Sequence, residues 1–185
     1  SAQAIGKPIK RIESFHSYKG GASGGTLETM FSMGELDLGD DLTNPFLLNP
    51  EDSYSDEQMQ LSSDRVGIAK KSEINAWSGP FIMATANTRV VRRTEALLAL
   101  RQESYGPDFT YQEHAFHKSW WSAAKSLVLT GLSVLILLSP LKRLVKPFLP
   151  KPGEGPSETV QENGWFDCKF IVEANDGTKS VFNMN

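Results

Sequence analysis

This sequence of 185 residues has little cysteine and little histidine, and its basic residues do not outnumber its acidic ones. The single cysteine, Cys168, excludes an internal disulfide and a cysteine-rich zinc site. Three histidines leave little material for a histidine cluster. The chain carries 19 Lys and Arg against 22 Asp and Glu, a net charge of -3, which argues against a nucleic-acid partner. The first ten residues contain no apolar run of the kind that a secretory signal needs.

The rest of the composition is typical of one folded domain. Hydrophobic residues make up 39% and charged residues 22%, which excludes wholesale disorder and a polytopic membrane protein. Charge is unevenly distributed, because no Lys or Arg occurs between Gly20 and Asp64 while ten acids do. We interpret about 35–75 as an acidic insertion and a long loop. It is either a solvated surface or a docking surface for a basic partner.

Periodicity and turn signals predict an α+β fold with a mixed, mostly antiparallel sheet and flanking helices. We expect strands near 9–19, 80–86, 109–113, 165–174 and 178–184. We expect helices near 26–35, 88–103 and 119–141. The last two strands are the clearest pair, because alternating residues flank an Asn175-Asp176-Gly177 turn and so indicate a β-hairpin.

The segment from Ser126 to Leu141 contains no charge and has no polar face. Aromatic residues precede it and basic residues follow it, which is typical of an apolar, membrane-facing helix. The alternative is a buried core helix. On the first interpretation the partner is a lipid or membrane surface, and the expected contact residues are Trp120, Trp121, Leu127, Leu132, Leu135, Leu138, Lys142 and Arg143.

The glycine-rich stretch 20–25 matches neither the dinucleotide fingerprint nor a phosphate P-loop, because its glycines and Thr26 stand at the wrong offsets. It does match the G-x-S-x-G pattern of a serine hydrolase around Ser23, with Asp108 and His114 or His117 following in order. Two other interpretations stay open: the close approach of a neighbouring chain segment, and anion binding by backbone N–H groups at a helix start.

Three further sets of residues have a chemical and a structural interpretation. His114 and His117 would share a metal if they lay on a helix, or are polar positions at an interface. The arginines at 89, 92 and 93 would clamp a phosphate or carboxylate, or form a solvated helix face with local ion pairs such as one to Glu95. Cys168 lies on the apolar face of the predicted hairpin and is expected to be a buried, inert thiol.

Four stretches in order resemble one family. They are GGASGGTLETM (20–30), WSGPFIMATANTRVVRRTEAL (77–97), YGPDFTYQEH (105–114) and KPGEGPSETVQENGWF (151–166). These stretches are similar to the saccharopine-dehydrogenase-like oxidoreductases, which include bacterial trans-acting enoyl reductases and an animal branch associated with lipid droplets. The resemblance covers nearly the whole chain outside the acidic insertion.

The resemblance implies that residues 1–185 form the second, non-Rossmann domain of such a protein. Family members begin with a Rossmann domain that binds NAD(P); we expect that domain to be absent here and no cofactor to be bound by this chain alone. We expect one of two functions. Either the chain is a fragment of a membrane-associated, NAD(P)-dependent oxidoreductase, or it is a non-catalytic accessory subunit that binds other protein subunits. The chain is expected to be membrane-associated; its organelle is left open among mitochondrial, plastid and lipid-droplet membranes, and no catalytic residue can be transferred from the family.

Overall fold

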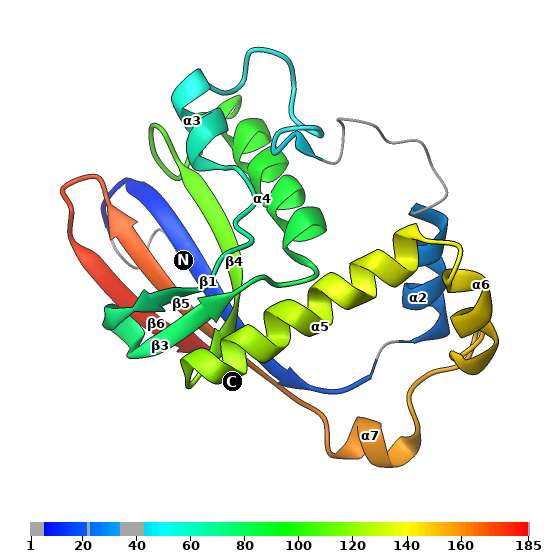
Figure 1. The fold of residues 1–185 in the computed structure, drawn as a ribbon. Helices are drawn as coiled ribbons and strands as arrows, with labels where there is room; N and C mark the ends of the chain where they lie inside the picture. The colour runs from blue at the N-terminus through cyan, green and yellow to red at the C-terminus, as the bar shows by residue number, and fades with distance from the viewer. Residues whose placement is uncertain (1–5, 22, 34–42, 185) are drawn as a thin grey trace.

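The computed structural model describes residues 6–21, 23–33 and 43–184 (Figure 1). Its strands are β1 (Ile9–Lys19), β2 (Ala69–Lys71), β3 (Ala76–Gly79), β4 (Thr110–His117), β5 (Trp165–Ala174) and β6 (Lys179–Met184). Its helices are α2 (Gly24–Met33), α3 (Asp56–Leu61), α4 (Ala84–Ala99), α5 (Trp120–Leu138), α6 (Lys142–Val145) and α7 (Glu158–Glu162), with 3-10 turns at Ser72–Ile74 and Lys146–Phe148. A mixed sheet with helices around it is an α+β fold.

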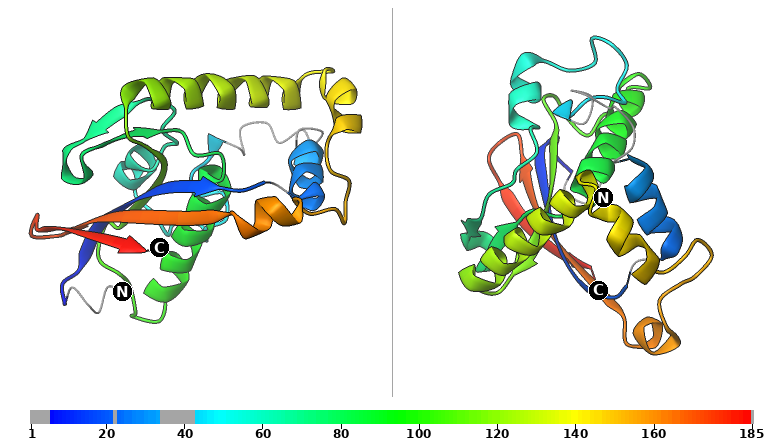
Figure 2. Two further views of the ribbon diagram at one scale, coloured as in Figure 1. Left: turned by 90° about the horizontal axis from the view of Figure 1, so that it is seen from below. Right: turned by 45° about the vertical axis from the view of Figure 1, so that its right-hand side comes forward.

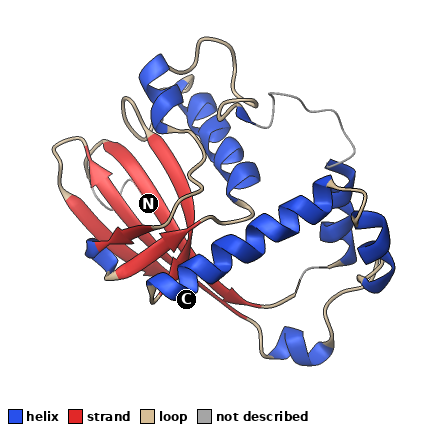
Figure 3. Cartoon of the chain, viewed as in Figure 1, coloured by secondary structure: helices blue, strands red, loops and turns tan. Residues whose placement is uncertain are grey.

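The described strands form one six-stranded sheet in the order β2-β3-β4-β1-β5-β6 (Figure 3). β1 and β4 run parallel, with Phe15 opposite His114, and every other neighbouring pair is antiparallel. β5 and β6 form the expected hairpin. Its turn contains Gly177 at a φ of 81°, a left-handed conformation that glycine adopts without steric cost.

The prediction of a strand at 80–86 is wrong. Pairing with β4 ends at Gly79, and the following proline has no N–H with which to extend the ladder. The apolar run from Phe81 instead enters α4, which begins at Ala84. The hydrophobicity of this run therefore reflects contacts outside the sheet, since its first residues line the cleft described below.

One face of the sheet carries the main core cluster. Ile9, Phe109, Tyr111 and Val172 are buried together, and Val91 of α4 packs against them. β3 pairs only with the last residues of β4. α4 lies beside the rest of that strand (Figure 1). Burial of these side chains fixes α4 on the sheet and so positions the residues at the start of that helix.

The helix predicted at 119–141 is present as α5, but the prediction that it faces a membrane is wrong. Within residues 6–21, 23–33 and 43–184, no helix is both long enough and apolar enough to cross a membrane. α5 begins at a capped terminus, where the Ser119 hydroxyl accepts a hydrogen bond from Ser122 N at 3.2 Å. Its first turns pack on the sheet, with Ala123 fully buried, and its far end reaches α2 and α6 (Figure 2).

The described part of the acidic stretch, from residue 43 onward, contains more regular structure than its composition predicts. The α3 helix starts with a capping box, in which Ser55 and Gln58 each bond the other's backbone N–H. The ring of Phe46 is buried and stacks on Tyr54 with centroids 4.3 Å apart. Residues 34–42 of the expected loop lie outside the described residues.

Candidate functional site

A buried polar network crosses from β1 to β4 and reaches α4. Ser14 Oγ lies 2.9 Å from His16 Nε2 and 3.1 Å from Tyr111 Oη. The Tyr111 hydroxyl donates to Glu113 Oε1 at 2.8 Å. Asn87 Nδ2 donates to the other carboxylate oxygen of Glu113 at 2.9 Å. The four strand residues of this network are all at most 8% exposed, so water does not screen their interactions.

Burial controls the protonation of the network. It raises the pKa of Glu113, although hydrogen bonds from Asn87 and Tyr111 partly oppose the rise. It also raises the pKa of Tyr111 far above its usual value. Burial, together with the nearby charge of His114, lowers the pKa of His16. A hydroxyl, an imidazole and a carboxyl in hydrogen-bond contact can hold and pass a proton.

An apolar cleft of about 810 Å³ lies against the network. Residues from the sheet, α2, the turn before α4, α5 and α6 line it, among them Tyr18, Leu27, Phe81, Met83, Ile136 and Phe166. The ring of His16 stacks on Phe81 at 4.6 Å and is tilted against Phe166 at 5.5 Å, so these two rings separate the network from the cleft. His16 Nδ1 is buried without a hydrogen-bond partner among the described atoms. The volume and apolar lining are typical of a small-molecule site.

The opposite face of the sheet holds an ionic cluster. Glu13 Oε1 lies 2.6 Å from Lys71 Nζ and 3.4 Å from His114 Nε2. Burial alone would raise the pKa of Glu13, but hydrogen bonds and positive charge from His114 and Lys71 outweigh it and lower the pKa to about 2. A groove of about 420 Å³ opens beside Lys71 and His114. The cluster is internally paired, which favours a structural role.

The glycine-rich turn does not fit the serine-hydrolase interpretation. Ser23 Oγ accepts a hydrogen bond from Thr26 N at 3.2 Å and lies 3.0 Å from the Thr26 hydroxyl. Neither His114 nor His117 bonds to it, so no catalytic triad forms among the described residues. A Cβ at Gly24 would lie 1.8 Å from the carbonyl oxygen of Lys151. The close approach of a neighbouring chain segment is therefore confirmed at Gly24.

The three arginines of α4 do not form a clamp. Arg89 makes two hydrogen bonds to Asp64, at 2.6 and 2.8 Å. Arg92 donates to the backbone carbonyls of Pro45, Ser62 and Tyr111, each at 2.8 or 2.9 Å. Arg93 donates to the carbonyl of Leu48. Arg89 and Arg92 are buried, so the expectation of a solvated face is also wrong for them; they hold the acidic stretch against the sheet.

His114 and His117, for which a shared metal was one of two interpretations, do not meet. Both lie on β4, where residues three positions apart point to opposite faces of the sheet. His114 stacks on Phe15, whereas His117 Nδ1 lies 3.2 Å from Ser122 Oγ. The described residues contain no group of three His, Cys, Asp or Glu placed to hold a metal. Cys168 is buried opposite His16, and burial raises its pKa to about 11, which agrees with an inert thiol.

The residues once expected to contact a membrane have mixed environments. Trp120, Trp121, Leu132 and Leu135 are exposed, and Leu127 is half-buried. The side chain of Leu138 lies outside the described part of the structure. Lys142 is half-buried and Arg143 is exposed on α6. Figure 2 shows that α6 lies beside α2 and does not continue the line of α5.

Comparison with known proteins relates the chain to enoyl reductases. A Mycobacterium tuberculosis (strain H37Rv) protein named as a trans-acting enoyl reductase is 32% identical over 185 residues, covering 91% of this chain and 43% of that protein. A Mycobacterium leprae trans-acting enoyl reductase is 32% identical over 111 residues, covering 56% of this chain and 26% of that protein. The chain thus spans less than half the length of these relatives. No family model and no solved structure matches it. The similarity supports an enoyl-reductase-like family and an oxidoreductase-like fragment.

Proposed function

We propose that this chain is the substrate-side part of an NAD(P)-dependent, saccharopine-dehydrogenase-like oxidoreductase that reduces an enoyl group in an acyl chain. The relatives named as enoyl reductases support the reaction class. The apolar cleft is the observation that carries the substrate class, because its lining suits a hydrocarbon chain and its volume suits a ligand of that size. The enoyl carbons would lie at the Phe81 end, next to the network.

The chain's own residues would bind and orient the substrate. Tyr18, Phe81 and Phe166 would pack on the acyl chain and exclude water from it. His16 and Glu113 would hold a proton immediately behind those rings, in a network already ordered by Ser14 and Tyr111. A nicotinamide, when bound, supplies hydride.

The proposal is tested by calorimetry with the whole chain and trans-2-dodecenoyl pantetheine. We expect saturable binding that Ile136→Asp weakens at least tenfold, because a carboxylate in the cleft would have to be desolvated. The matched control is Val134→Asp on the same helix. Val134 is 42% exposed and two positions away, so it faces away from Ile136. Equal binding by both variants would contradict the proposal.

An accessory subunit is the other function predicted from the sequence. It requires no acyl ligand in the cleft. Absence of binding by a folded wild-type chain would therefore favour that hypothesis over the oxidoreductase.

A further inference from the structure

The outer side of α5 carries an apolar stripe. Its large side chains are Trp121, Val128, Leu129, Leu132 and Leu135, which are 50 to 74% exposed. Ala123, on the opposite side of the helix, is fully buried. In the left view of Figure 2, no described segment lies over the outer side of α5. A folded monomer rarely leaves so many neighbouring apolar side chains open, and a patch of this kind marks an interaction site.

The stripe has the spacing of a seam between two helices. Positions 121, 125, 128, 132 and 135 are separated in turn by four, three, four and three residues, which is the alternation of a heptad repeat. Residues three and four positions apart lie on the same side of a helix. Four of the five positions are apolar, and Lys125 is the exception. A seam of this kind packs along the length of a second helix.

Lys125 determines which helix fits the seam. It is the only charged residue of α5. In a parallel pair of α5 helices, the two Lys125 ammonium groups would lie opposite each other and repel. In an antiparallel pair, each ammonium group lies near the C-terminal end of the other helix, where the helix dipole is negative. The charge of α5 is therefore complementary to a second α5 that runs in the opposite direction.

The same lysine determines the register of the antiparallel pair. When Lys125 lies opposite the partner's Leu135, Val128 lies opposite the partner's Leu132, and two-fold symmetry repeats both contacts. Moving one helix by one layer in one direction brings the two Lys125 residues close together. Moving it in the other direction places Trp121 and Lys125 beyond the end of the partner's helix. Only the first register joins the apolar positions and separates the charges.

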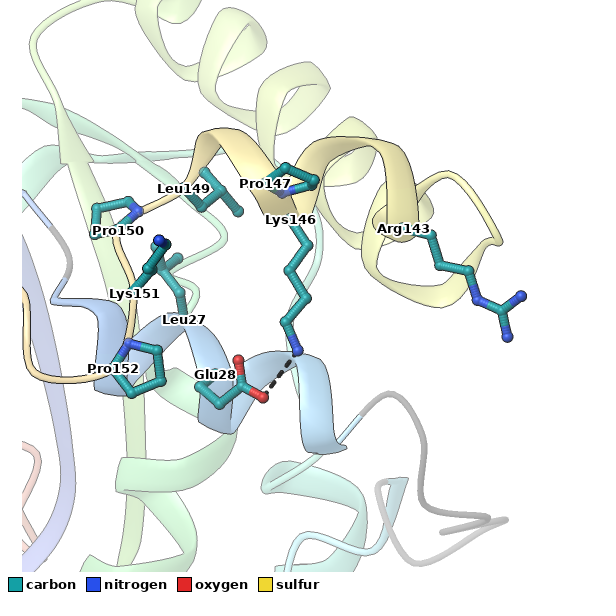
Figure 4. Close-up of a pocket in the computed structure, with 9 residues that line it drawn as sticks. All are labelled: Leu27, Glu28, Arg143, Lys146, Pro147, Leu149, Pro150, Lys151 and Pro152. Carbon is teal, nitrogen blue, oxygen red and sulfur yellow. Dashed lines mark hydrogen bonds and ion pairs between the residues drawn. The ribbon is translucent and has the colours of Figure 1, made fainter.

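Both ends of α5 are held in place, so the seam is a fixed surface. At the N-terminal end, Ser119 caps the helix and Ala123 is buried on the sheet. At the other end, the segment that follows α5 is tied to α2 by an ion pair of 2.9 Å between Lys146 and Glu28 (Figure 4). A surface that is ordered before it binds lowers the entropic cost of association.

We infer that α5 is the contact between two copies of this chain, which pack antiparallel about a two-fold axis near Thr130. Trp121, Val128, Leu132 and Leu135 form the apolar part of this contact. The stripe is small for an obligate dimer, so we expect reversible association. The inference goes beyond the proposed function and does not depend on it, because no acyl ligand takes part in the contact.

Sedimentation equilibrium of the whole chain tests the association. We expect the mass to rise from the 20.4 kDa of one chain toward twice that value as the concentration approaches roughly 100 μM, a range suited to a small interface. Leu132→Glu should weaken the dimer at least tenfold, because a carboxylate from each copy would have to be desolvated. Leu135→Glu, at a second seam position, should repeat this result.

The matched control is Val134→Glu on the same helix. Val134 is 42% exposed, and its position in the helical repeat turns it away from the seam. This variant should associate as the wild type does. Equal weakening by Leu132→Glu and Val134→Glu would overturn the assignment of the contact to the seam.

Disulfide trapping tests the orientation. K125C and L135C are made separately in the whole chain, whose own Cys168 is 1% exposed and does not compete. On mild oxidation, a mixture of the two variants should form a disulfide-linked dimer, whereas neither variant alone should. A cross-link formed by each variant alone would indicate a parallel pair and overturn the antiparallel assignment.

The remaining outcomes identify other occupants of the stripe. A wild-type chain that stays monomeric over the whole concentration range overturns the inference and leaves the proposed acyl site unaffected. A further arm adds phosphatidylcholine vesicles. Binding of a monomeric wild type to these vesicles, lost in Leu132→Glu, would assign the stripe to lipid and also overturn the inference.

Discussion

The ring of His16 stacks on the ring of Phe81 with centroids 4.6 Å apart, and this contact joins the polar network of the sheet to the apolar cleft. One residue belongs to β1 and the other to the turn before α4. Phe81 thus shields the imidazole from the solvent or ligand in the cleft.

Phe81→Ala should raise the pKa of His16 toward its ordinary value of 6.5, because burial is the main cause of its depression. The measurement is an NMR titration of the imidazole protons in the folded variant. Phe182→Ala is the control, since Phe182 lies on β6 and is 40% exposed. An unchanged His16 titration in folded Phe81→Ala would show that the ring does not shield the network.

The Glu13 cluster predicts a specific acid sensitivity. The pKa of Glu13 is about 2 in the folded protein against 4.5 ordinarily, so the carboxylate stabilises the fold above pH 4.5 and this stabilisation is lost as pH falls from 4.5 to 2. Glu13→Gln should flatten that part of the stability curve and cost roughly 2 kcal/mol at neutral pH, somewhat less than loss of a fully buried pair. Denaturant unfolding at several pH values measures the pH dependence of stability and the loss at neutral pH. Glu103→Gln, at an exposed position, is the control. A wild-type slope retained in Glu13→Gln would refute the assignment.

Glu113 should have the opposite pH dependence. Because its folded pKa is raised, ionisation of Glu113 opposes folding as pH rises above 4.5. Glu113→Gln, which cannot ionise, should therefore lose less stability than the wild type between weakly acidic and neutral pH. The same unfolding series measures this difference, and a steeper loss in the variant would contradict the burial argument.

Much of the fold follows from local patterns. The range 165–174 matches β5 because alternation and a strong turn define it on both sides. The network was not predicted, since Ser14 and Tyr111 are 97 positions apart and only the sheet brings them together. A signal was nevertheless present: Ser14 and His16, like Tyr111 and Glu113, are polar pairs two positions apart on predicted strands, so each pair shares a face.

Other differences have equally local causes. The strand predicted at 109–113 continues to His117, and this added length places His114 and His117 on opposite faces of the sheet. The α3 helix was missed because acidic composition outweighed the Ser55 and Gln58 capping signal. The apolar run of α5 indicated either a buried core helix or contact with lipid. In the structure, part of α5 packs on the sheet and Ile136 lines a cleft.

Gly24→Ala should destabilise the fold by about 1–3 kcal/mol, because the new methyl group would overlap the Lys151 carbonyl. Gly25→Ala is a matched control one position on, where the nearest atom is Ser23 Oγ at 3.9 Å, and it should be neutral or slightly stabilising. Thermal and denaturant unfolding measure the difference. Equal stability of the two variants would contradict the close packing of α2 against the backbone at Lys151.

Arg92→Lys should cost about 2 kcal/mol although it preserves charge. A lysine cannot bond three carbonyls from separate segments at once, so buried acceptors would lose partners. Arg101→Lys, at an exposed position after α4, should have no measurable effect. Hydrogen exchange should show the loss concentrated in residues 43–63, and uniform loss across the sheet would argue against this anchoring role.

The central claim, that an acyl chain lies in the apolar cleft, is tested most directly by photo-crosslinking. A trans-2-enoyl thioester with a diazirine in its alkyl chain is irradiated with the wild-type chain, and the adducts are located by mass spectrometry. We predict adducts at Phe81, Met83 and Ile136 that excess unlabelled thioester suppresses. Adducts confined to exposed apolar residues outside the cleft, such as Leu132 and Leu135, would contradict the account.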